Sequence, residues 1–145
     1  LAQRGCRHLA FWPMGNQRAT DPIFSFYRNA IAAHEIEYVP ELVYIGSELP
    51  SGGIAPSSQD HGYALAKHFF TQRKHKKINF DGLVVADDMV TDGALAALRE
   101  MNILPGRDIQ IATLANSGSP ILYRREKQLV MIDFDTHEIV HEMFA

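Results

Sequence analysis

The chain of 145 residues has little of what marks several common classes of protein. It contains one cysteine, Cys6, so no disulfide can form within the chain and a disulfide-stabilised secreted fold is excluded. No apolar run approaches the ~18 residues that a membrane-spanning helix needs, so no membrane partner is expected. The formal net charge is only −3, which excludes an overall basic field of the kind that attracts nucleic acid.

Motifs for common cofactors are also missing. The glycine after the first apolar run stands in "PMGN" (13–16), which is not the G-x-G-x-x-G of dinucleotide-binding folds, and no G-x-x-x-x-G-K-[ST] occurs. The seven histidines show no Cys/His ligand spacing, and the basic run "RKHKK" (73–77) has no interleaved aromatics and is interpreted as a solvated connection. We therefore expect no cofactor.

What the sequence does have is a regular alternation of apolar runs and helical patterns. The composition, 46% hydrophobic and 21% charged, fits one globular domain. Five runs are typical of buried strands: 8–13, 41–45, 82–86, 108–114 and 128–134. Helical patterns begin after Asp21, at about residue 59, at about residue 89 and after Asp135. Strand–helix alternation of this kind predicts an α/β fold, a three-layer α-β-α arrangement around a Rossmann-like, mostly parallel sheet covered on both faces.

Ligands of such sheets bind at the carboxyl ends of the strands. The residues to consider are therefore those that follow each strand: 12–15, 46–49, 87–88 and 115–118.

The segment "HEIVH" (137–141) matches the H-E-x-x-H zinc signature. On a helix, His137 and His141 fall on one face, but a zinc site of this kind needs a third protein ligand, usually from downstream. Only Glu142 follows, next to His141 and badly placed to join it. We expect these residues to decorate the solvent side of a terminal helix, so neither a metal site nor a catalytic residue is predicted.

Two adjacent aspartates end the run "GLVVA" and begin a helical pattern. One interpretation is a magnesium site of the phosphoacceptor kind, but the next strand ends "TLANS", without the further aspartate and the lysine that such a domain needs. The other gives Asp88 the N-cap role, where its carboxylate accepts backbone N–H groups and meets the helix dipole. Asp87, at the mouth of the strand, is then left to face a ligand.

The stretch "DGLVVADDMVTDGALAALREMNILPGRDIQIATLAN" (81–116) resembles LacI/GalR-type transcription regulators. The segments 1–43 and 57–70 and the final "QLVMIDFDTHEIVHEMF" (128–144) are also similar to that family, so that the resemblance covers essentially all of the chain in order. It implies the fold of periplasmic sugar-binding proteins, with residues 1–145 as the C-terminal lobe of the effector-binding domain. Residues from about 128 to 145 would reach toward an N-terminal lobe that is absent. The start "LAQRGCRH", without an initiator methionine or a signal-peptide pattern, likewise predicts a piece of a longer protein.

The resemblance further implies a non-catalytic, cytoplasmic, bacterial protein that senses a small effector. It would form a homodimer and contact operator DNA only through a missing helix-turn-helix headpiece. A periplasmic solute-binding lobe of a transporter is the alternative, and a metal-dependent hydrolase built on "HEIVH" or the aspartate pair is a remote one.

The chain differs from the family at positions that the resemblance places in the ligand pocket. The pocket arginine of the family aligns with Ile23, the asparagine of its "AND" motif is Asp87 here, and the aspartate that ends its fourth strand is Ala115. These losses argue against an ordinary monosaccharide as the effector. The site residues predicted from the resemblance, for a stacked, amine-bearing or otherwise different ligand, are Trp12, Phe24, Asp87 and Asn116.

Overall fold

A single parallel sheet forms the centre of the molecule in the computed structural model, which describes residues 1–13, 20–45, 49–75, 79–125 and 127–145. The strands lie in the order β1-β2-β3-β4, and every neighbouring pair is parallel. Their bounds are Leu9–Trp12, Gly82–Val85, Gln110–Asn116 and Val130–Phe134. The α/β class and the parallel sheet predicted from the sequence are therefore confirmed.

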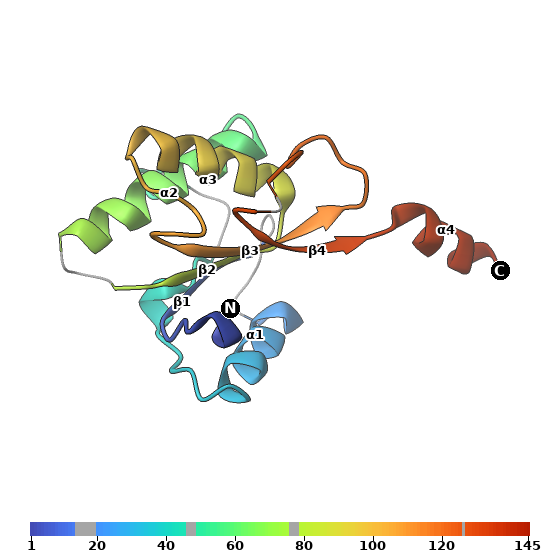
Figure 1. The fold of residues 1–145 in the computed structure, drawn as a ribbon, viewed down its shortest axis with the longest axis horizontal. Coiled ribbons are helices and arrows are strands. Elements are labelled where there is room, and N and C mark those ends of the chain that lie inside the picture. The colour runs from blue at the N-terminus through green and yellow to red at the C-terminus, as the bar shows by residue number, and fades with distance from the viewer. Residues whose placement is uncertain (14–19, 46–48, 76–78, 126) are drawn as a thin grey trace.

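Helices cover the sheet on two sides (Figure 1). One face carries α2 (Ser58–Lys74) and α3 (Asp88–Glu100), and the other carries α1 (Pro22–Ala32) with the short 3-10 helix η1 (Ala2–Arg4). The larger apolar core lies between the sheet and α2 and α3, and a smaller one lies under α1. This is the three-layer arrangement that the sequence predicts.

A fifth strand over residues 41–45 was also predicted, and that prediction is wrong. A 3-10 helix, η2 (Pro40–Leu42), occupies the start of this run, with the N–H of Val43 donating to the carbonyl of Pro40. Only an isolated bridge between Phe11 and Val43 joins the run to β1. Proline favours such a turn because its φ is fixed near the helical value and it has no N–H to donate to a ladder.

The contact between α2 and α3 depends on two glycines. A Cβ at Gly62 would lie 1.9 Å from the carbonyl oxygen of Val90, and one at Gly93 would lie 1.9 Å from that of Gln59. The two backbones approach so closely only because neither glycine has a side chain. This close packing fixes the first turn of α3 against α2, beside the carboxyl edge of the sheet.

Coverage of the α1 face is incomplete. An open apolar trough of about 590 Å³ runs between α1 and the strands β3 and β4. Phe26 on α1 is 70% exposed, and Ile132 on β4 is 60% exposed. The sheet is thus covered by two helices on the α2–α3 face but only over part of its width on the other.

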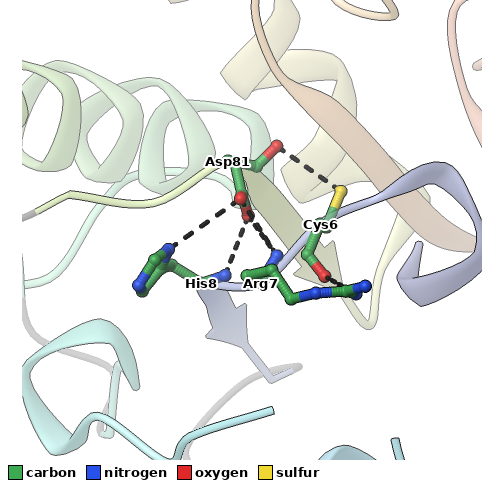
Figure 2. A network of polar contacts seen from close by, with 4 residues as sticks. All are labelled: Cys6, Arg7, His8 and Asp81. Carbon is green, nitrogen blue, oxygen red and sulfur yellow. Dashed lines mark hydrogen bonds and ion pairs between the residues drawn. The ribbon is translucent and has the colours of Figure 1, made fainter. Parts of the chain in front are cut away.

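Asp81 joins the segment before β1 to the start of β2 (Figure 2). Its carboxylate accepts the backbone N–H of Arg7 at 3.0 Å and that of His8 at 2.9 Å, and the imidazole of His8 lies 3.9 Å away. The thiol of Cys6 donates to the carbonyl of Asp81 at 3.7 Å. Burial raises the pKa of this thiol, so Cys6 is a packing residue rather than a nucleophile.

The helix α4 (Thr136–Phe144) begins at the predicted cap, since the carboxylate of Asp135 accepts the N–H groups of His137 and Glu138. It extends away from the three layers (Figure 1), and every one of its residues is exposed. Among the described helices, none has the length and apolar character needed to cross a membrane.

Candidate functional site

The candidate ligand site lies at the carboxyl edge of the sheet, where β2 and β3 end side by side. Val85, the last residue of β2, is in register with Thr113, three residues before the end of β3. Asp87 follows the one strand and Asn116 ends the other, so the chain brings these two predicted site residues to the same edge.

Asp87, not Asp88, is the N-cap of α3, so the cap predicted from the sequence is wrong by one residue. The backbone of Asp87 is extended, with φ −159° and ψ 130°, and its Oδ1 accepts the N–H of Val90 at 2.7 Å. A cap residue must have this extended conformation for its side chain to reach back to the third residue of the helix. The sequence offers two adjacent aspartates of equal capping ability, and only the backbone geometry distinguishes them.

Asp88 occupies the first helical position and is 7% exposed. Its Oδ2 is buried and has no hydrogen-bond partner in the described structure. A carboxylate at this position meets the positive end of the helix dipole, which offsets part of the cost of its burial. Of the pair, Asp88 is thus enclosed, whereas Asp87 is half-buried at the edge.

Two threonine hydroxyl groups fix the backbone carbonyl of Asp87 through hydrogen bonds. Its carbonyl oxygen accepts the hydroxyl of Thr91 at 2.8 Å, and that hydroxyl also lies 2.8 Å from the hydroxyl of Thr113 on β3. Both threonines are buried. The carboxylate of Asp87 uses Oδ1 for the cap, and within the described residues its Oδ2 has no hydrogen-bond partner. One oxygen therefore remains available to a ligand at a fixed position.

The two predicted aromatic site residues lie in the cores. Trp12 is fully buried, with its ring 5.3 Å from that of Phe69, and its indole N–H has no partner among the described residues. Phe24 is 3% exposed and packs edge-on against Phe11 at 6.0 Å. Both side chains are therefore enclosed by protein in this conformation. Residues 14–15 and 46–48, which the sequence also points to, lie outside the described residues.

A further carboxylate lies at the same edge and was not among the predicted site residues. Ala115, which stands where the family resemblance places an aspartate, is in register with Asp133 on β4. Residues paired in a parallel ladder point to the same side of the sheet, so Asp133 lies beside the position that Ala115 leaves without a charge. Predicting that Asp133 lies next to Ala115 requires the order of the strands in the sheet, and the sequence alone does not give that order.

The start of α2 contributes a small cavity of about 310 Å³ whose lining includes Ser57, His61 and Val90. Ser57 caps the helix, because its hydroxyl accepts the N–H of Asp60 at 3.1 Å and donates to the carboxylate of Asp60 at 2.6 Å. Burial lowers the pKa of His61. The cavity adjoins the capped turn of α3 through Val90. In the sequence, a serine followed three residues later by an acidic residue indicates that a helix starts at this position.

The "HEIVH" segment lies on α4, with all of its side chains exposed. The imidazole of His141 lies 3.7 Å from the carboxylate of Glu142, its neighbour in the chain. Across the described residues, no three metal-ligating side chains gather in one place.

Comparison with known proteins identifies the fold. Neither a protein-family model nor a curated protein sequence matches the chain. Among solved structures it is similar to the transcriptional repressor AscG of Escherichia coli, with 17% identity and a TM-score of 0.71 over 98% of this chain and 46% of that one. It is also similar to the transcription regulator CcpA of Lactococcus lactis, with 22% identity and a TM-score of 0.68 over 94% and 45% of the two chains. A complex of the transcriptional regulator CelR with cellobiose gives 19% identity and a TM-score of 0.67 over 97% and 39%.

These identities are low, and the likeness is therefore one of fold. The chain spans less than half the length of each of these regulators, and nearly all of its own length takes part in the match. The fold that the resemblance to LacI-type transcription regulators implies is thus confirmed: nearly all of the chain has the fold of one part of these regulators.

Proposed function

We propose that the chain is the ligand-sensing C-terminal lobe of a LacI-type transcription regulator. The observation that carries the proposal is the match of 94–98% of the chain to one part of AscG and of CcpA. Such a lobe binds without catalysing a reaction. A small effector held at its carboxyl edge would alter operator affinity through a DNA-binding headpiece elsewhere in the protein, as a homodimer in the bacterial cytoplasm.

The ligand contacts that we propose are Asp87 and Asn116, with Asp133 as a third. Asp87 offers a fixed carboxylate oxygen, and the side chain of Asn116 is exposed at the end of the neighbouring strand. Carboxylates form strong, charge-assisted hydrogen bonds with ammonium groups. Two carboxylates and an amide at one edge therefore favour an effector that carries an amine as well as hydroxyl groups. Trp12 and Phe24 support this edge from the core.

The helix α4 supports the proposal of a second lobe. Its apolar residues Ile139, Val140 and Met143 are 48%, 52% and 74% exposed, which is unusual for side chains at helical spacing on one element. We propose that residues from about 128 to 145 lead to an N-terminal lobe and that α4 packs against it. The cleft between the lobes would then enclose the effector.

The test is a thermal-shift screen of amines, amino sugars and neutral sugars on the two-lobed protein that the proposal predicts. Asp87→Asn is the informative variant, because asparagine caps helices as well as aspartate does and so spares the fold. Asp92→Asn, a half-buried aspartate on the same helix, is the matched control. We expect an amine ligand whose stabilisation is lost in Asp87→Asn and in Asn116→Ala but is retained in Asp92→Asn.

Equal stabilisation of wild type, Asp87→Asn and Asn116→Ala by the same ligand would refute the proposed site. Turnover of any screened compound, or a requirement for bound metal, would refute the non-catalytic assignment.

A further inference from the structure

A second pocket lies at the opposite, amino edge of the sheet, where β3 and β4 begin. It has a volume of about 390 Å³ and is formed by the last turn of α3, the loop that leads to β3 and the segment that precedes β4. Arg99, one of its lining residues, lies 12 residues after Asp87, about 18 Å along α3. The pocket is therefore distinct from the candidate effector site.

Three arginines from three separate segments line this pocket: Arg99, Arg107 and Arg125. The uncharged polar groups Asn102 and Gln128 also line it, and among the described residues no acidic side chain does. Positive charge is thus concentrated here although the whole chain has a net charge of −3.

One of the three charges is compensated within the protein. The guanidinium of Arg107 donates two hydrogen bonds to the carboxylate of Asp108, at 2.8 and 2.9 Å. Asp108 also accepts the N–H of Leu104 at 2.8 Å. The hydrogen bond from Arg107 lowers the pKa of Asp108, so that this carboxylate is ionised at neutral pH.

The other two charges are not compensated in this way. Arg125 donates to the amide oxygen of Gln128 at 3.1 Å, which is a neutral partner. Among the described residues neither Arg99 nor Arg125 makes an ion pair, and the neighbour Glu100 is engaged with Lys67 at 2.8 Å. By sequence the segment "RREK" (124–127) has a net charge of +2, so it adds positive potential.

Backbone hydrogen bonds fix the main chain at both arginines. The helix α3 ends at Glu100, one residue after Arg99, and Asn102 beyond its C-cap has a left-handed φ of 57° and donates its N–H to the carbonyl of Arg99. The carbonyl of Arg125 accepts the N–H groups of Gln128 and Leu129. Apolar residues also line the pocket, among them Leu95, which is 5% exposed. An apolar lining lowers the local dielectric and strengthens the attraction of an anion.

We propose that this pocket binds a phosphate group, either as inorganic phosphate or as the phosphate of a small phosphomonoester. Planar guanidinium groups bind phosphate oxygens in pairs, and two uncompensated guanidiniums that line one pocket from separate segments match a dianion. A phosphomonoester would place its organic part on Leu104 and Pro105, which also line the pocket.

Nuclear magnetic resonance titrations of this chain test the proposal through the arginine side-chain Nε–H signals. Inorganic phosphate is added at constant ionic strength against chloride, and phenyl phosphate is titrated in parallel. Saturable shifts of the Arg99 and Arg125 signals are expected. Tighter binding of phenyl phosphate would identify a phosphomonoester as the ligand, and equal binding would identify phosphate itself.

Each of Arg99→Gln and Arg125→Gln is expected to weaken phosphate binding by about tenfold or more, because a charge-assisted hydrogen bond is lost. Arg28→Gln is the matched control, since Arg28 is exposed on α1 and lies over the ring of Tyr38 instead. Thermal melting of each variant checks that it is folded. Arg125→Lys, which keeps the charge and loses the planar fork, is the second variant if Arg125→Gln does not fold.

The absence of saturable shifts in the wild-type chain would overturn the proposal. So would an affinity of the Arg99→Gln and Arg125→Gln variants equal to that of Arg28→Gln. Because the pocket and the probe differ from those of the effector site, neither result bears on the proposed sensing function.

Discussion

Replacing Asp87 by alanine is expected to destabilise the chain by about 1–2 kcal/mol. The change removes the carboxylate that accepts the N–H of Val90 at 2.7 Å, and the loss of an N-cap typically costs about 1 kcal/mol. The lost attraction between the charge and the helix dipole adds about 0.3–1 kcal/mol. For 145 residues the entropy of unfolding is about 0.3 kcal/mol/K, so we expect the melting temperature to fall by about 3–7 °C.

Replacing Asp88 by alanine serves as the paired comparison. Its Oδ2 is buried without a partner in the described structure, so removal of the carboxylate relieves a desolvation cost of about 1–3 kcal/mol while it gives up a dipole interaction of about 0.3–1 kcal/mol. We therefore expect Asp88→Ala to cause no loss of stability. Asp87→Asn should retain most of the wild-type stability, because asparagine also caps helices.

Urea denaturation followed by far-ultraviolet circular dichroism measures all three variants against wild type. A larger loss for Asp88→Ala than for Asp87→Ala would refute the assignment of the cap. Equal losses for Asp87→Asn and Asp87→Ala would refute the hydrogen bond to Val90 as the cause.

Three further predictions concern the elements around the site. Gly93→Ala should lower the free energy of unfolding by about 2 kcal/mol or more in urea denaturation, because the new Cβ would meet the carbonyl of Gln59, and a gain in stability would contradict the close helix contact. Thr91→Val should cost about 1–3 kcal/mol, since it removes the buried hydroxyl bonded to the carbonyl of Asp87 and to Thr113, and an unchanged denaturation midpoint would argue against these bonds. Burial lowers the pKa of His61 below 6.5 in the folded chain, so the unfolded chain takes up the proton first and stability falls as the pH drops below about 6.5. Denaturation series in urea at several pH values should show a shallower fall for His61→Gln than for wild type, and identical slopes would exclude this cause.

The sequence by itself determined the fold class and most of the elements. Continuous apolar runs separated by helical patterns require a parallel sheet covered by helices, because a strand buried on both faces has no polar side to alternate with. The first residues of two helices could also be predicted, because each is preceded by one clear capping residue. Asp21 precedes Pro22 at the start of α1, and Asp135 precedes α4. These features depend on neighbours within a few residues along the chain, and a sequence contains that information.

The tertiary structure alone decided the features that depend on neighbours in space. Residues 41–45 have the composition of a strand, yet a proline turn and a single bridge to β1 leave them outside the sheet. Of two adjacent aspartates, Asp87 became the cap because its backbone is extended where β2 ends. Burial of Trp12 in the core likewise followed from the packing of α2 over β1.

The same reason explains both proposed ligand sites. Asp133 lies beside Ala115 only because β4 pairs with β3 in that register, and Arg99 and Arg125 line one pocket only because both strand starts lie at the same edge. Local patterns along the chain set the identity of each element. The distances between side chains far apart in sequence are set by strand order, register and helix packing, which only the folded chain contains.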